Sequence, residues 1–195
     1  MDRARTWMIA AFVLAATAAP AAVTPSRPSP NWPAPADRSD VLLRDVALGM
    51  HNQARAGFGS APVAWSDALA AEARTYASSM ARTGVYAHDT SSGRRAKMGE
   101  NLWRGPRGVF SYQVMIGLMV DEVRHFRPGV FPAVSATGEW HDVAHYTQIV
   151  WPRTTEIGCG VAPSATTDYL VCRYAPTGNK DGVALVPNLQ VAALD

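Results

Sequence analysis

Apolar residues recur with the spacing of a helix in three stretches of the chain. The first stretch follows Asp40 and ends at the Gly57 and Gly59 pair, which predicts a helix between these points. The second follows Ser66, a residue suited to capping a helix, and its alanine-rich pattern continues to Gly84. Both stretches carry an apolar stripe, so each helix should bury one face against the rest of the protein.

A third amphipathic helix is expected from about Val109 to Phe126. Met115 and Met119 lie four residues apart on its apolar stripe, and Glu122 continues the same stripe. A carboxylate on an apolar stripe either faces solvent at the end of the helix or takes part in a site.

Shorter apolar runs predict strands. Ile157–Ala162 and Tyr169–Tyr174 are rich in β-formers and are joined by a polar turn, and Glu100–Trp103 fits a short buried strand or a turn. Helices interspersed with short, mainly antiparallel strands define an α+β fold class.

The first residues have the layout of an exported protein. Residues 1–22 combine two early arginines, an apolar run and small residues, as a cleaved signal peptide does. A membrane anchor needs about 20 continuous apolar residues, and this run is shorter. Residues 23–39, rich in Pro, fit an extended linker, so the folded domain is expected over 40–195 and outside the cytoplasm, secreted or periplasmic.

Length and charge restrict the remaining classes. A chain of 195 residues supports one sizeable core, and Lys plus Arg (18) exceed Asp plus Glu (16) by only two. No basic run is interleaved with aromatic residues, so nucleic acid is not an expected partner.

The chain has two cysteines, Cys159 and Cys172. In an oxidising compartment they are expected to form a disulfide, and two buried free thiols are the alternative. The loop between them is short, so the bond would secure a local hairpin.

The run HDVAHYTQIVW, from His141 to Trp151, raises the question of a metalloprotease helix. Two histidines at i and i+4, His141 and His145, can hold one zinc ion from one helix face, and the carboxylate of Asp142 could serve as general base. Asp reaches less far than the usual Glu, and the residues after His145 favour a helix only weakly.

Five stretches, in this order along residues 40–182, resemble the CAP superfamily of cysteine-rich secretory, antigen 5 and pathogenesis-related 1 proteins. They are MHNQAR with PVAW (50–55 and 62–65), GENLW (99–103), AHYTQIVW (144–151), IGCG (157–160) and LVCRYAPTGN (170–179).

The resemblance implies a three-layer α-β-α sandwich with a cleft on one face. The cleft residues of the family match His88, Glu100, Glu122 and His145 here. Family members bind zinc or another divalent cation through the two His, so His88 and His145 are the expected ligands, with Glu100 and Glu122 as candidate catalytic residues. His145 then pairs with His88 rather than His141, which leaves Asp142 to cap the turn that follows it.

Some positions depart from the family pattern. Lys180 follows Gly178-Asn179 where an apolar or amide residue is usual, Met119 stands where a Trp often precedes the second Glu, and the additional disulfides of many members are absent.

Three functional hypotheses follow. The first, which the resemblance implies, is a secreted binding module with a divalent-cation cleft and a neighbouring groove for a lipid or sterol. Phe126, Phe131 and Trp140 could line this groove if they are not core residues. The second is a metal-assisted hydrolase, protease-like, in which Glu100 or Glu122 deprotonates bound water; two protein ligands are fewer than the three usual in catalytic zinc sites. The third is an extracellular interaction module that binds another protein. Whether the protein is an enzyme is left open by the sequence.

Overall fold

The computed structural model describes residues 36–91 and 97–187, so the expected signal peptide and most of the expected linker lie outside the described residues. In chain order the helices are α1 (Asp40–Phe58), α2 (Asp67–Thr83), α4 (Tyr112–Val120) and α5 (Ala144–Ile149), with 3-10 segments η1 (Asp121–His125) and η2 (Trp140–Val143). The strands are β1 (Ala64–Trp65), β2 (Gly99–Pro106), β3 (Gly129–Val130), β4 (Glu156–Pro163), β5 (Thr167–Ala175) and β6 (Ala184–Leu185).

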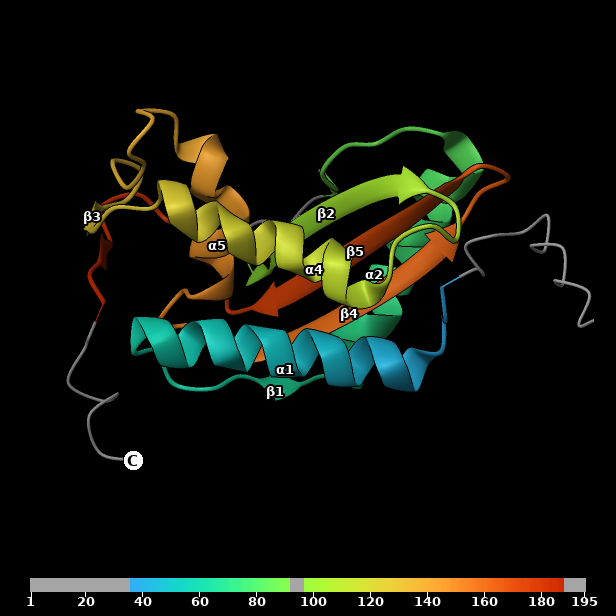
Figure 1. Cartoon of the computed structure of the whole chain (residues 1–195), viewed down its shortest axis with the longest axis horizontal. Coiled ribbons are helices and arrows are strands. Elements are labelled where there is room, and N and C mark those ends of the chain that lie inside the picture. The colour runs from blue at the N-terminus through green and yellow to red at the C-terminus, as the bar shows by residue number, and fades with distance from the viewer. Residues whose placement is uncertain (1–35, 92–96, 188–195) are drawn as a thin grey trace, which may run out of the picture. The chain divides into compact units, whose positions relative to one another are not determined.

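The central sheet has the order β1-β4-β5-β2 and is mainly antiparallel. β4 pairs with β5 and β5 with β2 in antiparallel register, whereas β1 pairs with β4 in parallel. Helices α1 and α4 cover one face and α2 covers the other, which gives three layers (Figure 1). The expected α+β class and α-β-α arrangement are confirmed.

The sequence predicts the glycine stops of both long helices and the Ser66 cap of α2, but not the Ser39 cap of α1. The hydroxyls of Ser39 and Ser66 accept hydrogen bonds from backbone N–H groups in the first turns of α1 and α2. Gly59 (φ 84°) and Gly84 (φ 74°) end these helices in the left-handed conformation, which glycine adopts without strain.

Helix α2 packs on the sheet without intervening side chains at two points. A Cβ on Gly158 would lie 2.3 Å from the Ala70 backbone nitrogen, and a Cβ on Gly160 would lie 2.4 Å from that of Arg74. The glycines of β4 therefore allow this close approach.

Cys159 and Cys172 face each other across β4 and β5 and form a disulfide, with 4.1 Å between their Cα atoms. Both residues are buried. The expected disulfide thus lies inside the core and joins the two central strands.

Two expectations about local structure need correction. The third helix is shorter than Val109–Phe126: it begins at Tyr112, after the Ser111 cap, and changes to the 3-10 segment η1 at Asp121. The change places Glu122 in the 3-10 segment rather than on an α-helical stripe. The segment expected at 100–103 is the eight-residue strand β2, because its whole length pairs with β5.

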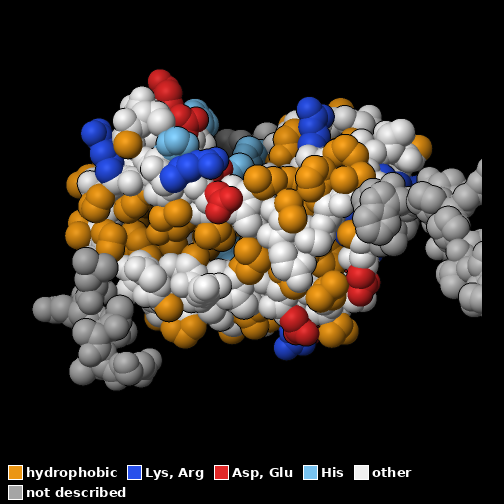
Figure 2. All heavy atoms as spheres, viewed as in Figure 1, with side chains coloured by type: hydrophobic (Ala, Val, Ile, Leu, Met, Phe, Trp, Pro, Cys, Tyr) orange, Lys and Arg blue, Asp and Glu red, His pale blue; other side chains and the backbone are white. Residues whose placement is uncertain are grey.

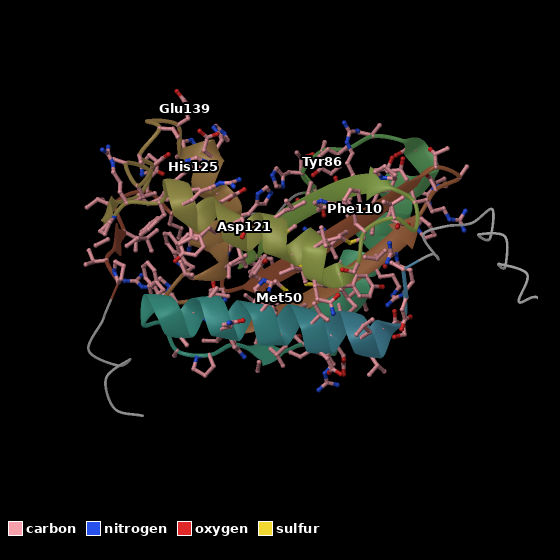
Figure 3. All side chains as sticks on the ribbon, in the orientation of Figure 1. Met50, Tyr86, Phe110, Asp121, His125 and Glu139 are labelled. Carbon is pink, nitrogen blue, oxygen red and sulfur yellow. A yellow bond between two sulfur atoms is a disulfide. The ribbon has the colours of Figure 1, made fainter. Side chains whose placement is uncertain are left out.

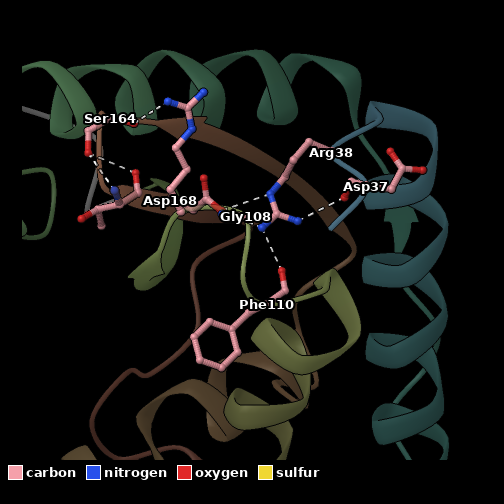
Figure 4. Close-up of polar contacts among 8 residues, drawn as sticks. Asp37, Arg38, Gly108, Phe110, Ser164 and Asp168 are labelled. Atoms are coloured by element: carbon pink, nitrogen blue, oxygen red, sulfur yellow. Dashed lines mark hydrogen bonds and ion pairs between the residues drawn. The ribbon is translucent and has the colours of Figure 1, made fainter. Parts of the chain in front are cut away.

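The segment before α1 is tied to the sheet. Arg38 donates from Nε and Nη2 to the buried carboxylate of Asp168, at 3.2 and 2.6 Å, and from Nη2 to the Phe110 carbonyl (Figure 4). Asp168 also accepts from the Gly108 N–H at 2.8 Å. The last residues of the expected linker, 36–39, therefore contact the folded domain.

None of the helices within the described ranges is both long and apolar enough to cross a membrane.

Candidate functional site

His88 and Glu100 form the first pair of the site. His88 lies in the loop after α2, and its Nδ1 is 2.7 Å from Oε1 of Glu100 on β2. The same oxygen accepts from the Asp89 N–H at 3.1 Å, and Oε2 lies 2.7 Å from Nη1 of Arg173 on β5. Only 2% of the Glu100 side chain is exposed, against 52% for His88. A buried carboxylate with several polar partners therefore orients a solvent-exposed imidazole.

Arg173 supports this pair without lining the cleft. Its side chain is 2% exposed and also donates to Asp89 at 2.8 Å, and its guanidinium lies over the ring of Tyr76. One guanidinium thus bridges the carboxylates of Asp89, 18% exposed, and Glu100, 2% exposed, which offsets the cost of burying the charge of Glu100.

Glu122 and His145 form the second pair. Glu122 Oε1 is 2.5 Å from Nδ1 of His145, and Oε2 accepts from the N–H groups of His145 and Tyr146 at 2.9 and 3.1 Å. Glu122 therefore caps the start of α5 and also orients the side chain of His145. The expectation that Asp142 would be the cap is wrong: the Asp142 carboxylate accepts from the Thr137 hydroxyl instead, and no side chain within the segment caps α5.

The two pairs meet at one cleft of about 420 Å³. His88, Glu100 and His145 line it, whereas Glu122 is not a lining residue and reaches the cleft through His145. Histidine side chains gather at a notch in the edge of the face shown in Figure 2. In Figure 3, Tyr86 lies on one side of this notch and Glu139 on the other. The described lining residues are Tyr86, Ala87, His88, Glu100, Asn101, Leu102, Trp140, His141, Ala144, His145 and Asn179.

The hydrogen bonds of the two histidines have a chemical consequence. In both rings Nδ1 is engaged by a carboxylate, so Nε2 is the nitrogen left for a ligand. A carboxylate that holds the distal nitrogen is the usual arrangement around metal-binding histidines. The residues therefore fit a divalent cation held by two imidazoles, with its other positions open to water or ligand. Across residues 36–91 and 97–187, no three His, Cys, Asp or Glu side chains are grouped so as to hold one metal ion.

A buried polar chain holds the backbone of His145 in place. The side chain of Asn101 donates to the His145 carbonyl at 3.1 Å and to the Tyr174 hydroxyl at 3.0 Å. Tyr174 in turn contacts Nε2 of the fully buried His51 at 2.8 Å, and Nδ1 of His51 contacts the Ala47 carbonyl. The site is thereby connected to α1 through the core.

The structure answers the question raised by HDVAHYTQIVW. Residues 140–143 form η2, and the α-helix starts only at Ala144, so His141 and His145 do not share an α-helical face. His141 stacks on Trp140, with 3.9 Å between ring centroids, and lies at the rim of the cleft. The metalloprotease-helix hypothesis is wrong for this segment.

Phe126 and Phe131 belong to the core. Phe131 is 3% exposed and packs edge-on against Trp140 and Trp151, and Phe126 packs between Phe58 and Tyr146. These two residues therefore do not line a groove, whereas Trp140, the third aromatic residue of that hypothesis, does line the cleft.

Three supporting residues were missed by the sequence analysis. Arg55 is buried in α1 and donates to the carbonyls of Ile149, Trp151 and Thr154. Arg173 and Asn101 were passed over as strand residues. The available signal was an arginine within an apolar pattern, as in YLVCRYA, because a buried guanidinium requires several acceptors.

Comparisons with known proteins agree with this fold. Residues 48–174 match the model of the cysteine-rich secretory protein family, CAP. Pathogenesis-related protein 1A of Nicotiana tabacum is 31% identical over 69% of this chain and 76% of its own length. Scoloptoxin SSD976 of Scolopendra dehaani is 35% identical over 59% of this chain, which spans 54% of that relative. The chain belongs to the CAP family.

Solved structures show the same architecture. The crystal structure of NaASP2 with Zn²⁺ aligns with a TM-score of 0.61 over 77% of this chain and 87% of that one, at 22% identity. Venom allergen-like protein 4 of Schistosoma mansoni aligns with a TM-score of 0.54 over 74% and 92%, at 21% identity. At these identities the alignments establish the fold.

Proposed function

We propose that this protein is an exported binding module whose cleft holds a divalent cation through Nε2 of His88 and Nε2 of His145, with zinc as the first candidate. The observation that carries the proposal is that each histidine has its Nδ1 held by a carboxylate and that both rings line one cleft. Imidazole nitrogen is a preferred zinc ligand, and bound zinc would present a positively charged Lewis acid to a second ligand. The structural relative NaASP2 has been crystallised with Zn²⁺.

Export is part of the proposal. The leader pattern of residues 1–22 supports it, and so does the disulfide, because such bonds persist mainly in oxidising compartments.

The hydrogen bonds of Glu100 and Glu122 favour a binding function over hydrolysis. Oε1 of Glu100 interacts with His88 and the Asp89 N–H, and Oε2 pairs with Arg173. Both oxygens of Glu122 are bonded to His145 or to the N–H groups that begin α5. These contacts favour carboxylates that orient histidines over carboxylates that take a proton from water.

The test is zinc titration calorimetry on the purified protein and on three single variants. His88→Ala and His145→Ala should each weaken one-site zinc binding by more than about tenfold, because each removes a metal ligand. Even the loss of a residue that only hydrogen-bonds to a metal ligand typically lowers metal affinity about 10–100-fold. His141→Ala is the matched control and should leave the affinity unchanged. Equal loss in all three variants would contradict the assignment. Peptide turnover that disappears in Glu100→Gln, with zinc affinity retained, would establish the hydrolase alternative.

A lipid or sterol is a second candidate ligand. The outward face of α4 exposes Val114 (43%) and Leu118 (48%), followed by Val123 (46%) in η1, and apolar side chains cover much of this face in Figure 2. If no zinc binds, sterol binding compared between the protein and Leu118→Asp tests this candidate, since a charge there should abolish apolar contact.

A further inference from the structure

A second hollow continues the histidine cleft. It has a volume of about 310 Å³ and shares His88, Glu100, Trp140 and Asn179 with the cleft. The two hollows therefore adjoin, and together they are termed the groove, with the histidine pair in its first part. The second part is bordered by the loop of residues 177–180.

Lys180 gives this second part its charge. It is the only Lys or Arg among the described residues that line the hollow, and its side chain is exposed. Within the described part of the chain it makes no ion pair with a carboxylate. The one acid in the lining, Glu100, already pairs with His88 and Arg173. The ammonium group is thus available to a ligand.

The loop that carries Lys180 is fixed to α5. Asn179 adopts a positive φ of 52°, and its side chain donates to the Ala144 carbonyl at 2.9 Å and accepts from the Thr147 hydroxyl at 2.8 Å. The neighbouring Gly178 N–H donates to the buried side chain of Gln148 at 3.1 Å. Because α5 also carries His145, these bonds hold the backbone before Lys180 in a set position relative to the histidine pair.

We propose that Lys180 forms an anion subsite of this groove and that the ligand of the cleft carries a carboxylate, which binds there while the rest of the ligand extends toward His88 and His145. A single ammonium matches one carboxylate. A phosphate needs more donors, and the nearby Gly178 N–H is already used. This inference rests on the proposed function, because the anion subsite and the proposed cation site would bind one ligand in the same cleft.

The test is an amide-detected NMR titration of the zinc-free protein with glutarate and with its uncharged analogue glutaramide. Glutarate should shift the amide signals of residues 178–180 in a saturable way, and glutaramide should not. Lys180→Gln should weaken glutarate binding about fivefold, as expected for an exposed ion pair at the upper end of its range. Arg153→Gln removes the same charge from an exposed position outside the groove and should have less than about a twofold effect.

Absence of glutarate shifts, equal shifts with glutaramide, or equal affinity in Lys180→Gln would each overturn the subsite. Because zinc is absent from this titration, its result is independent of the calorimetry on His88→Ala and His145→Ala. The two experiments can therefore fail separately: glutarate binding at Lys180 can be absent while zinc binds, and zinc binding can be absent while glutarate binds.

Discussion

At the scale of single residues, buried polar side chains connect the site to the core. His51 is fully buried, and burial lowers its pKa from 6.5 to about 4, an effect that its hydrogen bond to the Ala47 carbonyl opposes. Burial also raises the pKa of its partner Tyr174 well above the ordinary value. Both groups are therefore uncharged at neutral pH, and a neutral hydrogen bond between them avoids burying a charge.

The low pKa of His51 predicts that stability depends on pH. Between pH 6.5 and about 4 the unfolded chain binds a proton at His51 that the folded protein does not, so the free energy of unfolding falls as the pH falls through this window. The loss from this residue is on the order of 3 kcal/mol and is complete near pH 4. Urea unfolding at a series of pH values should show it, and His51→Gln should have a correspondingly shallower dependence. Parallel curves for the two proteins would refute the assignment.

At the scale of elements, α5 depends on its neighbours at both ends. The helix has six residues, too short to be stable alone. Glu122 binds N–H groups at its start, and Arg55 and Ser60 donate to the carbonyls of Ile149 and Val150 at its end. The position of His145 is thus determined by η1 and α1 as well as by its own segment.

The capping role of Glu122 gives a prediction for this element. Glu122→Ala should lower the free energy of unfolding by about 1–2 kcal/mol, because it leaves the first N–H groups of α5 without their acceptor. Asp142→Ala is the control from the same region. It should cost less, since Asp142 contacts only the Thr137 hydroxyl among the described residues. Equal losses in urea unfolding would argue against Glu122 as the cap.

At the scale of the whole molecule, Arg38 joins three distant segments. It links the residues before α1 to the β2–α4 connection through Phe110 and to β5 through Asp168. Asp168 is 1% exposed, so its charge depends on these donors.

Removal of Arg38 should therefore destabilise the protein more than removal of a surface arginine. Arg38→Gln is expected to cost about 2–3 kcal/mol, somewhat below the range for fully buried pairs because 25% of its side chain is exposed. Arg74→Gln breaks the exposed pair with Asp40 and should cost less than about 1 kcal/mol. A thermal unfolding comparison in which the two variants match would contradict this account.

Much of the fold could be predicted from local pattern. The Ser66 cap, the glycine stops and the apolar runs of β4 and β5 are properties of short segments, and the structure has them at the expected places. The end of the third helix could not be predicted in this way, because the apolar spacing continues through the change to 3-10 geometry at Asp121.

For the candidate site, the sequence is enough to identify the candidate residues, since motif matches name His88, Glu100, Glu122 and His145 one by one. It also placed Cys159 and Cys172 on two predicted strands joined by a turn, and the expected disulfide between them is present. The contacts of these residues are visible only in the folded protein: Arg173 holds Glu100, Glu122 caps α5, and Lys180 borders the same groove. Hydrogen bonds between segments far apart in the chain leave no periodic pattern in the sequence. Their donors and acceptors come within about 3 Å of one another only when the chain folds.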